Sequence, residues 1–519
     1  MGLGCCPHAS TITKIFTFLK NMDVPWTPLY AQSNKSGNVS TSESFTATWT
    51  MALTVLFTVA VFAFEHYLDE RQADAYKKTD FPLELEDTVG KIDSEKVPDV
   101  KKDANGEGDK SSGASDEKTD SSKLDKDKPI LPQLKEKFDK SQKYGTDKIV
   151  FGMIQSFYGV VETVVFLLMG FMPYFWDLSV NFGEQYFGWN ESENEIKISL
   201  IFLAITSLLA TFTGIPWELY STFKIEKKHG FNKQTLGLFF SDKVKSTLLG
   251  FVFGGPFVAL LLKIIDWGGE YFYLYVWAFT FLFSAFMMTI VPVFIMPLFN
   301  KYEPLQDGEL KTRIYALADK LKYPLTKLFV MDGSKRSSHS NAFMFGFGKN
   351  KRIVLFDTLL DQVDDDEILA ILGHELGHWK LGHTLTNFAI TQIYFGAAFF
   401  FFSLCFTSDD LYRAFGFDDT NRSIPTIIAL TFFFQTVWAP VDKILSFCLT
   451  LFSRKCEFQA DEFSANLGMA KKLQTGLCKI SLENLGAMCP DPFYAMYHYS
   501  HPPLVERLSA MINMEKKTK

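Results

Sequence analysis

Long apolar stretches alternate with charged loops along the chain, and this alternation predicts helices that cross a membrane. A helix needs about 20 mostly apolar residues to span the hydrocarbon core of a bilayer. Seven stretches meet this requirement, and they cover residues 46–64, 149–175, 198–215, 247–265, 271–299, 385–406 and 424–451. A buried soluble helix could explain any one of them. Seven together predict an all-α membrane protein with seven transmembrane helices embedded in a lipid bilayer.

The loops between these stretches differ in charge, and the difference predicts an orientation. Loop 218–246 carries six lysines, whereas loop 177–196 has neither lysine nor arginine. Basic loops stay in the cytosol, so we expect a lumenal N-terminus and a cytosolic C-terminus. The Asn-x-Ser sequons at Asn38, Asn190 and Asn421 all lie on the predicted lumenal side.

The C-terminal tail predicts a compartment. Lys516 and Lys517 occupy the fourth and third places from the end, as in a dilysine retrieval signal of the endoplasmic reticulum. We therefore expect a multi-pass protein of that membrane, with the inner nuclear membrane as a second location. The alternative is an ordinary solvated basic tail.

Composition narrows the class of protein further. The seven cysteines are scattered without a C-x-x-C pair, which indicates mostly reduced thiols and fits a cytosolic catalytic part. The net charge of -7 comes with no basic stripe, so no nucleic-acid partner is expected. Residues 86–146 are rich in Asp, Lys, Ser and Gly, and we predict a largely disordered cytosolic insert there.

The segment around residue 375 contains the motif HExxH. On a helix, residues four apart share a face, so His374 and His378 can bind one metal ion. Glu375 lies beside the first of them and can act as the general base on a metal-bound water. Four acidic residues, 364–367, precede the motif and suit a helix N-terminus.

A catalytic zinc of this kind needs a third protein ligand. The metzincin pattern fails, because Leu381 and Thr384 stand where it requires Gly and His. His383 would point about 140° away from His378 on a continuous helix, so we expect a surface or second-shell histidine. The better candidate is Glu457, with Asp461 one turn later to orient a ligand histidine. Cys456 is a competitor, but it lies about 100° off the face of Glu457.

Several runs together resemble the type I CAAX prenyl proteases, which are zinc metalloendopeptidases of the gluzincin HExxH…E kind. The runs are 335–341, 349–360, 374–383, 453–461 and 499–507, and the stretches 67–85 and 227–236 resemble the family too. The resemblance implies a seven-helix barrel around a large chamber, with a small cytosolic α/β protease portion. It also implies one Zn2+ per chain and prenylated CAAX proteins as substrates.

The resemblance also implies roles for single residues. Asn341 and His339 are similar to residues of an edge strand that holds the substrate backbone. His501 is similar to a histidine that stabilises the oxyanion, and Arg507 to an arginine close to the metal ligand Glu457. Locally, 327–331, 341–347 and 352–356 are short β-rich runs that predict a small sheet able to bind an extended peptide.

These inferences divide the chain into seven parts. They are a lumenal segment 1–45, a first span and loop 46–85, the insert 86–146, four spans in 147–300, a zinc protease segment 301–384, two spans in 385–451, and a cytosolic end 452–519. The predicted activity is removal of the last three residues of a CAAX protein, by Glu375-assisted attack of zinc-bound water. The alternatives are a quality-control protease of the same fold and a non-enzymatic seven-helix protein.

Overall fold

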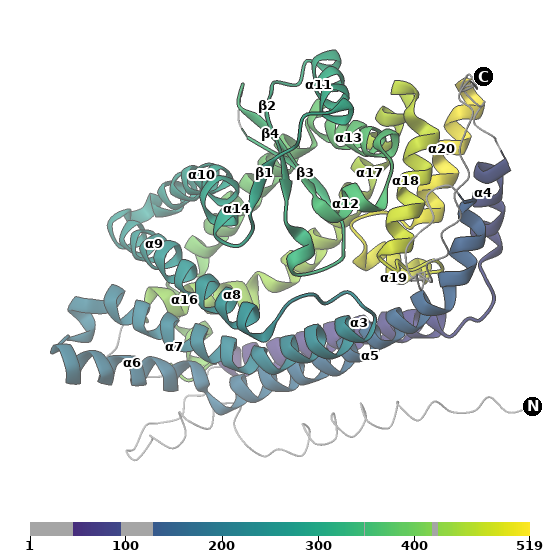
Figure 1. Ribbon diagram of the computed structural model, residues 1–519. Coiled ribbons are helices and arrows are strands. Elements are labelled where there is room, and N and C mark those ends of the chain that lie inside the picture. Colours follow the sequence, from purple (N-terminus) through teal and green to yellow (C-terminus); the bar gives the residue numbers. More distant parts are fainter. Residues whose placement is uncertain (1–44, 95–127, 347, 418–423, 519) are drawn as a thin grey trace, which may run out of the picture.

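The structure is a computed structural model that describes residues 45–94, 128–346, 348–417 and 424–518 (Figure 1). The predicted lumenal segment 1–45 lies almost wholly outside the described residues, as do the sequons at Asn38 and Asn421. Orientation and glycosylation therefore stay predictions.

Six helical stretches are long and apolar enough to cross a membrane, or seven if one bent pair counts as a single span. The chain is thus a multi-pass membrane protein, as predicted. The spans are formed by α3 (Phe45–Tyr76), α5 (Ile130–Met169), α7 (Glu191–Tyr220) with η1 (Ser221–Glu226), α8 (Leu236–Leu249) with η2 (Gly250–Gly254) and α9 (Gly255–Trp267), α10 (Phe272–Ile290) with its short flanking turns, α14 (His383–Cys405), and the bent pair.

The bent pair corrects the prediction of one continuous span over 424–451. α16 (Thr426–Phe432) and η7 (Phe433–Val437) end at Trp438, and α17 (Ala439–Ser464) leaves at 60°. Pro440 stands at the start of α17. Proline has no backbone N–H and favours the first turn of a helix, so the chain bends where the sequence looks uniformly apolar.

The predicted span 149–175 is also divided. Gly170 ends α5 in the left-handed conformation (φ 72°), and α6 (Phe171–Phe187) starts immediately afterwards. Glycine adopts this conformation without steric cost and commonly terminates helices.

The membrane helices are exposed on more than one side. Between 0 and 22% of the residues in the apolar windows of the six stretches are buried. A cavity of about 700 Å³ lies between α3, α5, α6, α7 and η7, and Glu162 and Gln155 are among its lining residues. The helices therefore present one side to lipid and another to an internal space, and Glu162 lines that space.

The protease portion combines a small sheet with helices. The strands are β1 (Tyr302–Pro304), β2 (Leu325–Met331), β3 (Ala342–Phe345) and β4 (Lys351–Phe356), in the order β1-β2-β4-β3. β2 and β4 run parallel, and the other two pairs are antiparallel. The three predicted strands are confirmed, and β1 was missed. Since β3 pairs only with β4 in the described sheet, β3 is an edge strand.

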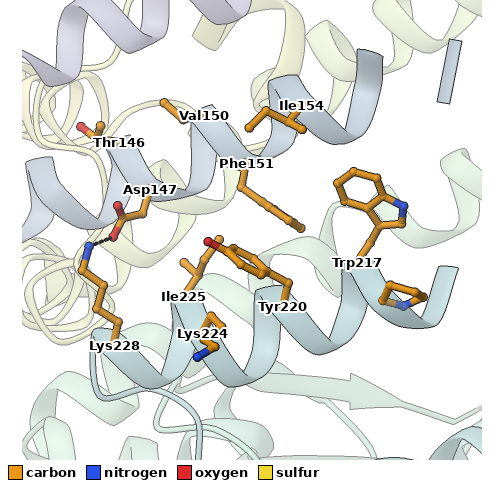
Figure 2. Close-up of a pocket in the computed structure, with 11 residues that line it drawn as sticks. Thr146, Asp147, Val150, Phe151, Ile154, Trp217, Tyr220, Lys224, Ile225 and Lys228 are labelled. Carbon is orange, nitrogen blue, oxygen red and sulfur yellow. Dashed lines mark hydrogen bonds and ion pairs between the residues drawn. The ribbon is translucent and has the colours of Figure 1, made fainter. Parts of the chain in front are cut away.

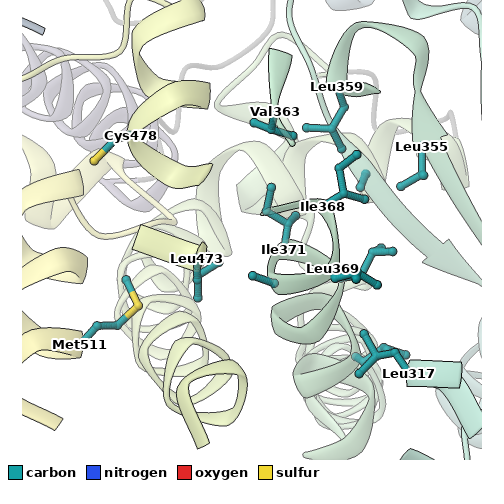
Figure 3. Close-up of a cluster of buried hydrophobic side chains, with 14 of the residues drawn as sticks. Leu317, Leu355, Leu359, Val363, Ile368, Leu369, Ile371, Leu473, Cys478 and Met511 are labelled. Atoms are coloured by element: carbon teal, nitrogen blue, oxygen red, sulfur yellow. The ribbon is translucent and has the colours of Figure 1, made fainter. Parts of the chain in front are cut away.

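One hydrophobic core joins the sheet to the helices of this portion (Figure 3). The helices are α11 (Glu309–Leu321), α12 (Asp357–Gln362), α13 (Asp365–Lys380), α18 (Ala470–Glu483) and α20 (Leu504–Thr518). Ile368, Leu369 and Ile371 of α13 pack between Leu355 of the sheet and Leu473 of α18. α13 therefore lies in the middle of the core.

Both ends of the predicted insert 86–146 are helical, which corrects its boundaries. α4 (Leu83–Ser94) buries Val89, and the first part of α5 buries Leu134, both with 0% exposure. The Asp93 carboxylate accepts hydrogen bonds from the backbone N–H groups of Ile130 (3.1 Å) and Leu131 (2.8 Å). The apolar residues are too few to dominate the composition, yet their helical spacing lets α4 pack on α5 and α20.

A buried ion cluster fixes the start of α13. Asp364 and Glu367 form a capping box, and Lys479 of α18 reaches Glu367 (2.9 Å) and Asp364 (3.0 Å). Glu367 is 2% exposed and Lys479 is 4% exposed. Removing one partner of a buried pair leaves a charge that has lost its water.

We expect Lys479→Met to destabilise the protease portion by about 3 kcal/mol, because Glu367 loses its cation. The control is Lys472→Met, since Lys472 pairs with the half-exposed Asp366 at 3.2 Å and Arg313 also contacts that carboxylate. Exposed pairs contribute about 1 kcal/mol or less. Thermal unfolding of both purified variants measures the difference, and equal melting temperatures would contradict the prediction.

Candidate metal centre

α13 and α17 approach each other closely, and two glycines of the HExxH helix allow it. A side chain at Gly373 would meet Ser464 Oγ at 3.0 Å, and one at Gly377 would meet Phe463 at 3.1 Å. The Ser464 hydroxyl donates a hydrogen bond to the backbone carbonyl of Ala370 at 2.8 Å. This contact places the face of α17 that carries Glu457 against the two histidines of α13.

Three potential ligands converge there, and they are His374, His378 and Glu457. The two histidine Nε2 atoms are 3.2 Å apart. Nε2 of His374 lies 3.5 Å from Oε2 of Glu457, and Nε2 of His378 lies 3.3 Å from its Oε1. These are the residues that the sequence analysis selected, so the predicted grouping matches the geometry.

The group fits a tetrahedral metal ion. Zinc bonds of about 2.0–2.1 Å place neighbouring ligand atoms roughly 3.3 Å apart, close to the three spacings given above. Glu457 is 5% exposed, and its buried Oε2 has no hydrogen-bond partner among the described residues. A buried carboxylate oxygen without a donor is costly, and a cation between the three side chains removes that cost.

Asp461 and Arg507 lie beside the first histidine. Oδ1 of Asp461 lies 2.8 Å from Nδ1 of His374, on the ring side away from Glu457. Arg507 donates to both oxygens of Asp461, at 2.8 Å from Nε and 2.6 Å from Nη2. Its Nη1 lies 3.6 Å from Glu457. A carboxylate that accepts from Nδ1–H leaves Nε2 free to bind metal.

His383 matches the second of the two positions expected for it, because it contacts a ligand histidine and does not lie on the surface. Its Nδ1 is 2.9 Å from Nδ1 of His378, and its Nε2 is 3.2 Å from Oε1 of Gln459. It is 7% exposed, so it is a buried neighbour of a ligand and not a surface residue. The helical-wheel angle failed because α13 ends at Lys380 and Gly382 is left-handed (φ 74°), which turns His383 back.

Glu375 lies beside the ligand pair and is partly buried. Burial raises the pKa of its carboxyl above the usual range, and the charges of His374 and His378 act in the opposite direction. A general base works best when its pKa is closer to the working pH. A raised pKa is compatible with the general-base role predicted for this residue.

His501 stands on the open side of the group. Its Nε2 is 3.4 Å from Oε1 of Glu457, and its Nδ1 is 3.0 Å from the Ser500 hydroxyl. The side chain is 65% exposed, so it can contact a molecule that enters the site.

Asn341 and His339 do not lie in a strand, which corrects the expectation that they share a strand face. β3 begins at Ala342, and the Asn341 side-chain oxygen accepts from the Ala342 N–H at 2.8 Å. The His339 ring stacks on the Phe231 ring, with the two ring centroids 4.2 Å apart. His339 also lines a cavity of about 460 Å³ shared with α3, α5 and the 484–499 region.

Gln459 and Ser464 are neighbours of the centre that the sequence analysis missed. Gln459 is two positions after Glu457 and points to a different side of an ideal helix. A lone serine within a helix, such as Ser464, gives no sequence pattern that would indicate a place in the site. Gln459 contacts His383, the first residue of α14, and the Ser464 hydroxyl bonds to the carbonyl of Ala370 in α13. Only the tertiary contact between α13 and α17 identifies them.

Membrane-spanning helices joined to an HExxH helix, with a carboxylate as the third potential metal ligand, are typical of an integral-membrane metallopeptidase. Residues 130–301 match the family model "CAAX prenyl protease N-terminal, five membrane helices", and residues 304–515 match "Peptidase family M48". The chain belongs to the CAAX prenyl protease 1 family of M48 peptidases. It is accordingly a metalloprotease.

Individual relatives agree with this assignment. A CAAX prenyl protease 1 homolog from Arabidopsis thaliana is 48% identical over 401 residues, which cover 75% of this chain and 92% of the relative. The Homo sapiens homolog is 44% identical over 428 residues, which cover 75% of this chain and 89% of the relative. The crystal structure of S. mikatae Ste24p has a TM-score of 0.74 at 34% identity and covers 89% of this chain and 98% of that one.

We expect Glu457→Gln to lower metal affinity at least about 100-fold, because a neutral amide replaces an anionic ligand. Elemental analysis of the purified protein after dialysis measures the bound metal. Glu462→Gln is the matched control, since Glu462 lies on the same helix and is exposed. Full metal content in Glu457→Gln would assign the third ligand to another residue.

Asp461→Asn should weaken metal binding by about 10- to 100-fold, because an amide does not hold the His374 Nδ1–H as a carboxylate does. Arg507 would at the same time lose its charged partner. Competition with a metal-sensitive dye measures the affinity. An unchanged affinity would show that Asp461 only anchors Arg507.

Proposed function

We propose that the chain is a zinc endopeptidase that removes the last three residues of prenylated CAAX proteins. The observation that carries this proposal is the convergence of His374, His378 and Glu457 beside a partly buried Glu375. The choice of substrate comes from the names of relatives that are up to 48% identical, which are CAAX prenyl protease 1 homologs.

In this proposal the three convergent side chains hold one zinc ion, which lowers the pKa of water and polarises the scissile carbonyl. Glu375 accepts the proton of the attacking water and passes it to the leaving amine. Burial raises the pKa of the Glu375 carboxyl above its usual range, which makes it a stronger base than an exposed carboxylate and supports the first of these transfers. Asp461 and Arg507 hold His374 in the tautomer that presents Nε2.

His501 is proposed to donate to the oxyanion that develops during attack. Its exposed ring and its 3.4 Å separation from Glu457 support this role. The oxyanion needs a protonated donor, and a neutral imidazole still has one N–H.

The substrate is proposed to bind as an extended strand beside β3. The described sheet leaves one edge of β3 unpaired, and backbone addition to such an edge is a general mode of peptide binding. Asn341 and His339 immediately precede that strand and are proposed to contact the peptide. The basic loop 218–246 and the dilysine tail support a site that opens to the cytosol from the endoplasmic reticulum membrane.

The test is cleavage of a farnesylated CAAX peptide by the detergent-purified protein, analysed by mass spectrometry. We expect release of the last three residues, and a loss of kcat of at least about 100-fold in Glu375→Gln. The variant should keep its metal, because Glu375 is not a ligand. Glu462→Gln is the control for a remote change of the same kind.

The outcomes separate two functions. No cleavage by a zinc-loaded wild type, together with cleavage of an unfolded membrane protein, would favour the quality-control protease. Cleavage that survives in Glu375→Gln would overturn the assignment of the base.

A further inference from the structure

A slot of about 910 Å³ lies between α5 and the segment formed by α7 and η1 (Figure 2). Its walls are apolar and aromatic over most of their length. The Phe151 ring stacks on Tyr220 with centroids 5.2 Å apart and lies 5.8 Å from Trp217. The charged lining residues are Lys224, Lys228 and Asp147, and they lie away from Trp217 and Ile154. The slot is therefore amphipathic along its axis.

The slot and the cavity shared with His339 use different faces of α5. The α5 residues of the slot, 147, 150, 151 and 154, share one helix face. The cavity shared with His339 uses α5 residues 145, 148, 149, 152 and 156, on the opposite side of the helix. Val150 and Ile154 are 45% and 55% exposed. The slot therefore lies on the side of α5 away from the cavity shared with His339, and at Trp217 it adjoins the cavity of about 700 Å³ between α3, α5, α6, α7 and η7.

One lysine at the charged end of the slot is not paired with a carboxylate among the described residues. Lys228 pairs with Asp147 at 2.6 Å, and His229 contacts the same carboxylate at 2.6 Å. Lys224 has no carboxylate partner among the described residues, and its side chain is exposed. A lysine ammonium beside an apolar wall is a site for an anionic group that carries an apolar chain.

The backbone supports a binding role at the same place. The helix carries Pro216 and then changes to the π-helix η1 over Ser221–Glu226, between Trp217 and Lys228. π-helical turns are uncommon and occur often at functional sites. From Pro216 to Lys228 the slot extends about 18 Å along the axis, close to the roughly 15 Å depth of one leaflet of the hydrocarbon core.

We propose that this slot binds one anionic glycerophospholipid. An acyl chain lies against Phe151, Trp217 and Ile154, and the headgroup phosphate contacts the Lys224 ammonium. Basic pockets between transmembrane helices near the cytosolic surface are typical sites for anionic headgroups. If loop 218–246 is cytosolic, the lipid belongs to the cytosolic leaflet. The proposal does not depend on the substrate of the protease.

The experiment is native mass spectrometry of the full-length protein, titrated separately with dioleoylphosphatidylserine and dioleoylphosphatidylcholine. We expect a retained phosphatidylserine, and about five-fold weaker retention in Lys224→Gln, which corresponds to one lysine–headgroup contact. The matched control is Lys227→Gln, because Lys227 is exposed on the same turn but does not line the slot. That variant should bind like the wild type.

Two further variants locate the bound lipid. Val150→Trp fills the slot, keeps both lysines, and should also lose phosphatidylserine. Brominated phosphatidylserine should quench Trp217, measured as the difference between the wild type and Trp217→Phe. Equal retention of both lipids, or equal loss in Lys224→Gln and Lys227→Gln, would overturn the proposal in favour of ordinary boundary lipid.

Discussion

The burial of two carboxylates on α17 is the constraint on which the rest of the site depends. Asp461 is 0% exposed and Glu457 is 5% exposed. Carboxylates that lose their water must be compensated by cations or donors. Arg507 compensates Asp461 with two hydrogen bonds but only approaches Glu457, at 3.6 Å. A metal ion held by Glu457 and the two histidines completes the compensation, so it is part of the stability of the site as well as its chemistry.

This constraint connects distant parts of the chain. His374 contacts Asp461, 87 residues later, and Arg507, 133 residues later. α14 follows α13 after a turn of two residues, and α17 is the second helix of the bent pair. The two helices that meet at the metal centre are therefore extensions of membrane helices. The packing of the spans sets the distance between the ligands, and Gly373 and Gly377 allow that distance to be short.

The features that could be predicted from the sequence are those that depend on patterns of neighbouring residues. The i, i+4 spacing of HExxH and of Glu457 and Asp461, the apolar length of the spans and three strands are local patterns, and the structure matches them. His383 could not be placed, because its position depends on the turn at Gly382. The bend before Pro440 lies inside a uniformly apolar stretch. The helices at the ends of the insert depend on a few apolar residues, such as Val89 and Leu134, whose burial only the tertiary contacts reveal.

α5 contacts lipid, the internal space and the protease portion at once. One face forms the slot, and another lines the cavity shared with His339. Near the start of α5, Ser141 bonds to the backbone of Gly486 at 2.8 Å. A lipid in the slot thus touches the helix that forms a wall of the interior. It can alter the interior only if α5 has two positions and the lipid prefers one, since equal affinity for both shifts neither. Otherwise a bound lipid acts as packing that holds α5 against α7.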